Sequence, residues 1–348
     1  MPATNHAPLI ALLSAALFGL STPLAKLLLG DVDPWLLAGL LYLGSGTGLT
    51  VLYVLRKAPG EAKLSRADLP WLAGTIFFGG MAGPILLLYG LTLSDAASAA
   101  LVLNLESVFT LGIAWVVFHE HVDAKLFMGA AAIVAGALLL SWQGGFGEAG
   151  MGTLLIALAC LAWAIDNNLT RKISAVDPVV LAAIKGIGAG SVNTVLAFSM
   201  GAALPGLPAL SGALLLGFVS YGLGLVLFII ALRHLGAART GAYYGTAPFI
   251  GAVGAVLIFG TPITPVLLIA GILMGIGAWL HLAEHHAHDH AHEEATHDHR
   301  HAHDEHHQHA HGPDDPPGEP HAHVHGHAAL AHSHRHWPDL HHQHRHTS

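Results

Sequence analysis

Three ionisable side chains stand inside long apolar stretches of the sequence. Glu106 lies about ten residues into one such stretch, and Asp166 and Lys185 lie in two consecutive later ones. Ionisable groups at membrane depth are rare, face the interior of a helical bundle, and serve substrate binding or proton transfer. These three residues are therefore the first candidates for binding chemistry.

Glu106 is expected near the middle of the bilayer, since about ten residues of helix rise about 15 Å. The amide of Asn104 is close to it in sequence. A carboxyl group buried without a partner favours its protonated form. Two interpretations stay open: a proton-coupling or substrate-cation group, or a protonated side chain whose hydrogen bonds fix helix packing.

Asp166 and Lys185 are predicted to form an ion pair. Asp166 is about five residues before the end of its stretch and Lys185 about seven residues into the next, so their depths agree within a turn. The pair either fixes the fold or acts as a cytoplasmic gate or substrate clamp. The amides of Asn167 and Asn168 follow the carboxylate directly.

Prolines interrupt two other apolar stretches beside small polar residues, at Ser21-Thr-Pro23 and at Thr246-Ala-Pro248. Matched interruptions in two halves of a membrane protein are the best sequence indication of a central binding site. We therefore add Pro23, Pro248 and Tyr243 to the candidates. Tyr89, Tyr221 and Tyr244 could line the same space, although each tyrosine alone more often packs or anchors at the interface.

A histidine-rich tail follows the last apolar stretch and holds 25 of the 29 histidines, at and after His281. Its His-x-His spacing suits Ni, Co or Zn, because neutral imidazoles gather on one ion. No other cofactor is expected. The tail, 284–348, lacks apolar periodicity and is predicted to be disordered. The metal ligands we expect are His286, His288, His290, His292, His297, His299, His301, His303, His321, His323, His325 and His327.

The composition excludes an ordinary soluble enzyme. The chain is 53% hydrophobic and only 10% charged, whereas soluble domains average about 25% charged residues. No GxSxG, P-loop or HExxH motif occurs, so we expect no enzyme activity. The formal net charge of −8 belongs to the tail, since acids and bases balance before His281.

Ten apolar stretches are each long enough to cross a bilayer, which takes about 20 residues. Because lipid offers no partner for free backbone groups, we predict ten helices rather than strands. The fold class is therefore an all-α membrane protein. The spans are 8–29, 34–55, 69–91, 96–118, 125–142, 151–170, 178–203, 211–232, 238–260 and 264–283.

Basic residues predict the orientation, because cytoplasmic loops are enriched in Lys and Arg. All nine loop bases follow even-numbered spans, so both termini and the tail are expected in the cytoplasm. The membrane is expected to be the plasma or inner membrane. These bases are Arg56, Lys57, Lys63, Arg66, Lys125, Arg171, Lys172, Arg233 and Arg239. Lys26, by contrast, lies near the outer end of the first span and is expected to snorkel to the interface.

The second half of the sequence repeats the first. At an offset of 141 residues, Gly83 falls on Gly224 and Phe118 on Phe259, and at 145 residues Lys26 falls on Arg171. Five spans per repeat make the second copy inverted, as in many secondary transporters. We expect repeats at 1–142 and 150–283, followed by the tail.

This organisation resembles the drug/metabolite transporter superfamily with two EamA-type repeats. The residues that carry the resemblance are Leu17-Phe-Gly-Leu-Ser-Thr-Pro23 and Phe118-His-Glu120, and it covers about 8–283. The second repeat departs from it, since Phe259-Gly-Thr-Pro262 has no acid where Glu120 would recur. The resemblance implies a transporter, mostly an exporter of small metabolites or amino acids, and names no substrate.

Two other functions stay open: efflux of Ni, Co or Zn fed by the tail, and a membrane-tethered metal buffer or sensor. The apolar spans offer no Cys/His ligand pair, which argues against the first. The intramembrane acids have no role in the second. We expect no nucleic-acid partner and a monomer or homodimer. Gly44-x-x-x-Gly48, Gly186-x-x-x-Gly190 and Gly271-x-x-x-Gly275 are interpreted as packing sites between helices of one chain.

Overall fold

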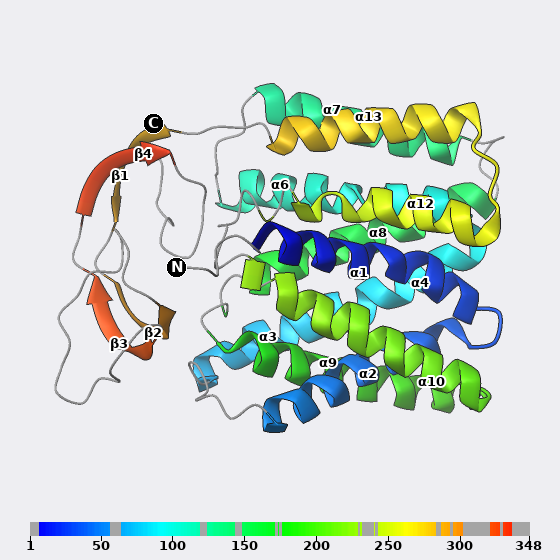
Figure 1. Cartoon of the computed structure of the whole chain (residues 1–348), viewed down its shortest axis with the longest axis horizontal. Helices are drawn as coiled ribbons and strands as arrows, with labels where there is room; N and C mark the ends of the chain where they lie inside the picture. The colour runs from blue at the N-terminus through cyan, green and yellow to red at the C-terminus, as the bar shows by residue number, and fades with distance from the viewer. Residues whose placement is uncertain are drawn as a thin grey trace.

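The computed structural model describes residues 7–55, 64–118, 124–142, 148–170, 173, 176–228, 230–231, 240 and 243–282, with the backbone of four strands in the tail. Its helices lie side by side in one bundle (Figure 1). Among the described residues, eight helices are long and apolar enough to cross a membrane, and Ala247–Phe259 and Pro265–Leu280 are shorter apolar helices. The chain is therefore an all-α membrane protein, as its sequence predicts.

The helices follow the predicted spans closely. In the first half they are α1 (Ala7–Leu28), α2 (Pro34–Leu55), η2 (Arg66–Asp68), α3 (Leu69–Thr75), η3 (Ile76–Ala82), α4 (Gly83–Leu93), α5 (Ala96–Val102), α6 (Leu105–Phe118) and α7 (Ala124–Ser141). In the second half they are α8 (Glu148–Thr170), α9 (Pro178–Ser199), α10 (Leu207–Leu216), η5 (Gly217–Leu223), α12 (Ala247–Phe259) and α13 (Pro265–Leu282). Helix α9 ends before the predicted residue 203, because Gly201 adopts a positive φ of 91°.

Irregular helical turns recur at matching places in the two halves. Segments η3 and η5 are both π-helical, and both bounds of η5 lie 141 residues after those of η3. The same offset relates α7 to α13. Turns at Leu103–Asn104 and Gly245–Thr246 precede α6 and α12. The offset found in the sequence thus recurs in the bounds and the irregularities of the helices.

Small residues let facing helices approach closely. Helix α2 packs along α9, α7 along α13, α1 on α12, and α6 on α8. At the α2–α9 crossing, a Cβ added to Gly186 would lie 2.6 Å from the Cα of Gly46. The Gly186-x-x-x-Gly190 motif therefore packs within the chain, as predicted.

The two ends of the bundle differ in packing. The end where α1 begins and α13 finishes lies beside the tail (Figure 1), and we name it the tail end and the opposite one the far end. The largest buried cluster joins residues from the far-end halves of the helices, among them Leu36, Leu37, Leu87, Leu91, Ile133, Ile156 and Met274. At the tail end, two smaller clusters gather around Leu49 and Leu72. Among the described residues, the apolar core that joins many helices thus lies towards the far end.

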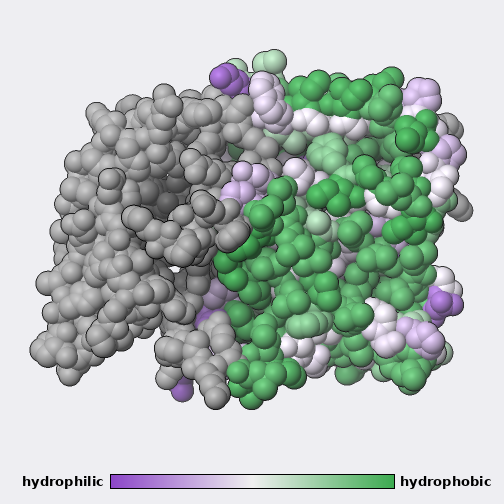
Figure 2. All heavy atoms as spheres, in the orientation of Figure 1, coloured by the Kyte–Doolittle hydropathy of each residue, from purple (hydrophilic) through white to green (hydrophobic). Residues whose placement is uncertain are grey.

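The surface is consistent with a lipid environment. Figure 2 shows a face of the bundle covered mainly by hydrophobic residues, with hydrophilic ones towards its ends. Two of the predicted cytoplasmic bases, Arg66 and Lys125, are exposed at the tail end. The other seven lie outside the described residues.

Four segments of the tail pair as strands, and disorder of the tail as a whole stays a prediction. Strand β1 (Ala287–His292) pairs with β4 (Leu330–Arg335), and β2 (Ala295–His301) with β3 (His321–His327), both antiparallel. Alternating His-x-His residues have the two-residue period of a strand.

Candidate functional site

Glu106 occupies the first turn of α6, directly after the mid-span break between α5 and α6. Nearby polar side chains stabilise the break. Asn104 donates through Nδ2 to the carbonyl of Leu101 at 2.8 Å, and Ser107 donates through Oγ to the carbonyl of Asn104 at 2.8 Å. Asn104 is buried. It therefore supports the break in the helix instead of facing a ligand beside Glu106.

The Glu106 carboxylate contacts Asn167 of α8 instead. Asn167 donates through Nδ2 to Oε1 of Glu106 at 2.7 Å. Glu106 is half-buried and Asn167 is exposed. Since polar groups at this depth face the bundle interior or a water-filled space, the pair is able to receive a further ligand.

The predicted Asp166–Lys185 ion pair is present. Lys185 Nζ lies 2.5 Å from Asp166 Oδ2, and Thr170 donates to Asp166 Oδ1 at 3.2 Å. The side chains keep only 14% (Lys185) and 8% (Asp166) of their surface exposed. Lys185 thus neutralises Asp166, its direct partner, one residue along α8 from the amide that binds Glu106.

The π-helix η3 lies against this ion pair. Its irregular geometry turns the carbonyl of Gly79 towards two other helices, where it accepts from Tyr42 Oη (2.5 Å) and Trp163 Nε1 (3.1 Å). A Cβ added at Gly79 would lie 2.6 Å from Lys185 Nζ and would also meet the Asp166 carboxylate. Glycine is thus required where the ion pair contacts η3.

Six aromatic rings form a connected group beside these polar residues, which we name the aromatic cluster. The ring of Phe18 lies 6.4 Å from Trp163, 6.1 Å from Tyr221 and 5.5 Å from Tyr244. Tyr42 extends the group from Tyr221 at 5.6 Å, and Phe228 from Tyr244 at 4.6 Å. The cluster joins rings from both halves of the sequence.

Several predicted residues lie elsewhere. Asn168 is buried and donates to the carbonyl of Ala164 at 2.8 Å. Pro23 is buried inside α1, which continues through it without a break, whereas Pro248 stands in the first turn of α12. Of the paired tyrosines, Tyr244 belongs to the aromatic cluster, and no described ring contact involves Tyr243. Tyr89 is exposed on α4.

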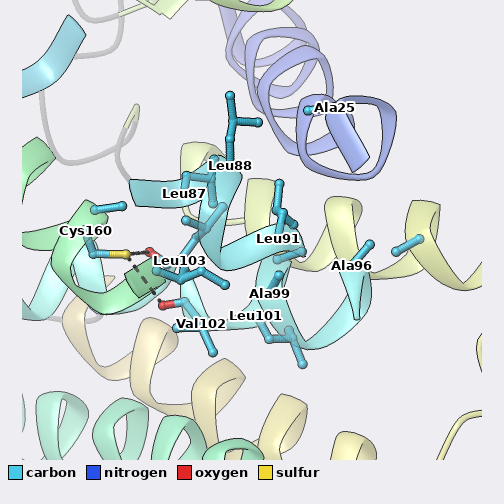
Figure 3. Close-up of a cluster of buried hydrophobic side chains, with 14 of the residues drawn as sticks. Ala25, Leu87, Leu88, Leu91, Ala96, Ala99, Leu101, Val102, Leu103 and Cys160 are labelled. Atoms are coloured by element: carbon cyan, nitrogen blue, oxygen red, sulfur yellow. Dashed lines mark hydrogen bonds between the residues drawn. The ribbon is translucent and has the colours of Figure 1, made fainter. Parts of the chain in front are cut away.

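Two residues have roles that the sequence did not indicate. The Cys160 thiol lies 3.8 Å from the carbonyl oxygens of Val102 and Leu103, at the end of α5 (Figure 3). Lys26 donates to the carbonyls of Leu91 and Ser94 (3.0 Å to Ser94). Instead of snorkelling, it caps the C-terminal end of α4 at the far end of the bundle.

The tail histidines are placed only in part. His286 and His303 lie outside the described residues, and the other ten predicted ligands fall on strands, where His297 faces His325 and His299 faces His323 in register. Across the part of the chain that the structure describes, no group of three or more His, Cys, Asp or Glu could hold a metal ion. Metal binding by the tail stays a prediction.

Comparisons with known proteins agree with this architecture. The sequence model of the EamA-like transporter family matches residues 6–142 and 150–283. An uncharacterized transporter of Methanothermobacter thermautotrophicus is 29% identical over 291 residues, which cover 78% of this chain and 84% of the relative. One protein crystal structure matches with a TM-score of 0.61 and 21% identity over 79% of this chain and 97% of the other. This last likeness shows a shared fold.

Proposed function

Because the chain belongs to the EamA-like transporter family, we propose that it is a secondary transporter that exports a small solute by alternating access. The solute class suggested by the resemblance is a metabolite or amino acid. No nucleotide-binding motif accompanies the bundle, so an ion gradient supplies the energy. The chain is a multi-pass membrane protein, and the proposal places it in the plasma or inner membrane.

The hydrogen bond between Asn167 and Glu106 carries this proposal. It joins α6 to α8, which lie in the two separate segments that match the family. In transporters built from two repeats, the substrate site lies near the midplane at the repeat interface. A polar contact across that interface, with accessible surface, is therefore the best candidate for the transport site.

A mechanism follows from the same contact. A solute that binds Glu106 competes with Asn167 for the carboxylate, and so removes a hydrogen bond that holds α6 against α8. Once that contact is replaced by the solute, the two repeats are free to rock and expose the site on the other side. After the solute leaves, protonation of Glu106 would neutralise its carboxyl group and allow the protein to return to the first side.

Glu106→Gln tests this mechanism. Glutamine keeps an oxygen that accepts from Asn167 but cannot bind and release a proton, so we expect proton-coupled transport to fall at least tenfold. Liposomes that contain the purified protein and a pH-sensitive dye would report proton movement as amino acids, amines and carboxylates are added in turn. Asp31→Asn, at an exposed loop carboxylate, is the control. Equal proton movement in Glu106→Gln and the wild type would refute the role of Glu106.

The cytoplasmic orientation is also part of the proposal. Helix α1 begins and α13 ends at the tail end of the bundle (Figure 1). The exposed bases Arg66 and Lys125 lie at the same end, which supports this orientation. Accessibility of a tail epitope in intact and in permeabilised cells would test it. Antibody binding only after permeabilisation is the expected result.

Metal binding by the tail gives a separate prediction. The full chain should bind several Zn²⁺ or Ni²⁺ ions in calorimetric titration at pH 7.5, and deletion of 285–348 should remove this binding. Histidine titrates near pH 6.5, so imidazoles bind metal above that pH and release it as they protonate below it. Binding should therefore be largely lost at about pH 5. An unchanged number of bound metal ions after the deletion would contradict metal binding by the tail. If the deletion abolished metal export but left solute export unchanged, the metal-efflux function would be favoured.

A further inference from the structure

We propose that the solute is a monovalent substituted ammonium cation, bound between Glu106 and the aromatic cluster. This inference rests on the proposed transport function and assigns a chemical class to its substrate. Charge and ring geometry carry it.

Charge comes first, because among the described residues the site has one carboxylate more than it has cations. Asp166 is neutralised by Lys185 at 2.5 Å, whereas Glu106 receives a hydrogen bond from the neutral amide of Asn167. With Glu106 ionised, these groups sum to one negative charge. A charge left uncompensated at membrane depth is costly, so the site favours a ligand with one positive charge.

The aromatic rings lie next to this carboxylate. Trp163 precedes Asn167 by four residues on α8, which places both on one face of the helix, and Trp163 contacts Phe18. Trp163 and Tyr42 both donate to the carbonyl of Gly79, which packs against the Asp166–Lys185 pair beside Asn167. The polar pair and the rings therefore form one continuous site.

The exposure of the rings leaves room for a ligand. Phe18, Tyr221, Tyr244 and Phe228 are half-buried, whereas Tyr42 and Trp163 are buried beneath them. An ammonium group within about 6 Å of a ring centroid is attracted to the ring face, and groups of aromatic residues recognise quaternary ammonium ions. Four partly open rings in one connected cluster on the same side of α8 as the polar pair match this chemistry.

Other ligand classes fit less well. Among the described residues of the site, the cation that an anion would need is Lys185, and its ammonium is already bound to Asp166. A divalent ion takes about six oxygen ligands or several imidazoles and thiolates, and the described part of the bundle holds no such group. A proton alone is a poorer fit as the ligand, because the aromatic rings would not strengthen its binding to Glu106.

Three soluble probes of similar shape separate charge from size: choline, its neutral analogue 3,3-dimethylbutan-1-ol, and the anion 3,3-dimethylbutanoate. Radiolabelled choline should bind the purified full-length protein in detergent, and neither analogue should displace it at tenfold higher concentration. Glu106→Gln should weaken choline binding at least tenfold. Phe18→Leu and Tyr244→Leu should each weaken it about threefold to tenfold, as loss of one ring contact predicts.

Tyr89→Leu is the matched control, since Tyr89 is exposed on α4 away from the cluster, and it should bind like the wild type. Displacement by the neutral alcohol, or equal binding by Glu106→Gln, would overturn the inference. The proton-movement assay keeps the two proposals distinguishable. A protein that moves protons with some other solute, but fails to bind choline, loses the cation assignment and remains a transporter.

Discussion

Replacing Lys185 by Met should lower the free energy of unfolding by about 3–5 kcal/mol, the cost of leaving one buried charge without its partner. The Asp166 side chain is 8% exposed, and Gly79 leaves no space in which the carboxylate could turn away. Methionine matches lysine in length and packing, so the loss measures the ion pair. Unfolding of the purified protein in detergent, followed by circular dichroism, provides the measurement.

The double variant Asp166→Leu/Lys185→Met isolates the charge effect. Replacing both partners of a buried pair with apolar residues is often neutral or stabilising, so the double variant should recover most of the stability that Lys185→Met loses. Lys125→Met, at an exposed lysine, should change stability by less than about 0.5 kcal/mol. A double variant less stable than Lys185→Met would show that the pair contributes through something other than charge balance.

Gly186→Ala should destabilise the bundle by about 3 kcal/mol, the upper part of the range for overpacked cores. The added Cβ would lie 2.5 Å from the Gly46 nitrogen and 2.9 Å from the Tyr42 carbonyl oxygen. These are backbone atoms, so no side chain can rotate away, and α2 and α9 must separate. Because Tyr42 also holds η3, the shift would reach the ion pair. The same unfolding measurement applies.

Gly112→Ala is the matched control for this substitution. Gly112 lies in α6, and a Cβ there would meet nothing within 4 Å. Alanine is preferred to glycine inside helices by roughly 0.5–1 kcal/mol, so this variant should be as stable as the wild type or more so. Equal effects of Gly112→Ala and Gly186→Ala would mean that close packing at the α2–α9 crossing contributes little.

Hydropathy alone predicted most of the helix bounds, since a membrane segment must be apolar and must satisfy its own backbone. Depth arguments also paired Asp166 with Lys185 correctly, because consecutive helices that enter from one side place equal depths together. The partner of Glu106 was not predictable in this way. It lies on α8, which is distant in sequence, and the neighbouring Asn104 is used by the helix break.

The π-helices were missed for a different reason. A π-turn adds one residue to a helical turn without changing hydropathy, and Gly79 and Gly80 resemble the many other glycines of the chain. The aromatic cluster shares this difficulty, since its rings come from five separate segments. The sequence offers Tyr221 and Tyr244 of this cluster as candidates, whereas neither Phe18 nor Trp163 is distinguished by type or spacing from the other aromatic residues of the spans.

The uneven distribution of the apolar core has a consequence for the transport cycle. If the tail end faces the cytoplasm, as we propose, the leucine-rich cluster lies on the outer side of the membrane and forms the outer gate. Opening outward must expose that leucine seal, so the return from the outward-facing state should be the faster half of the cycle.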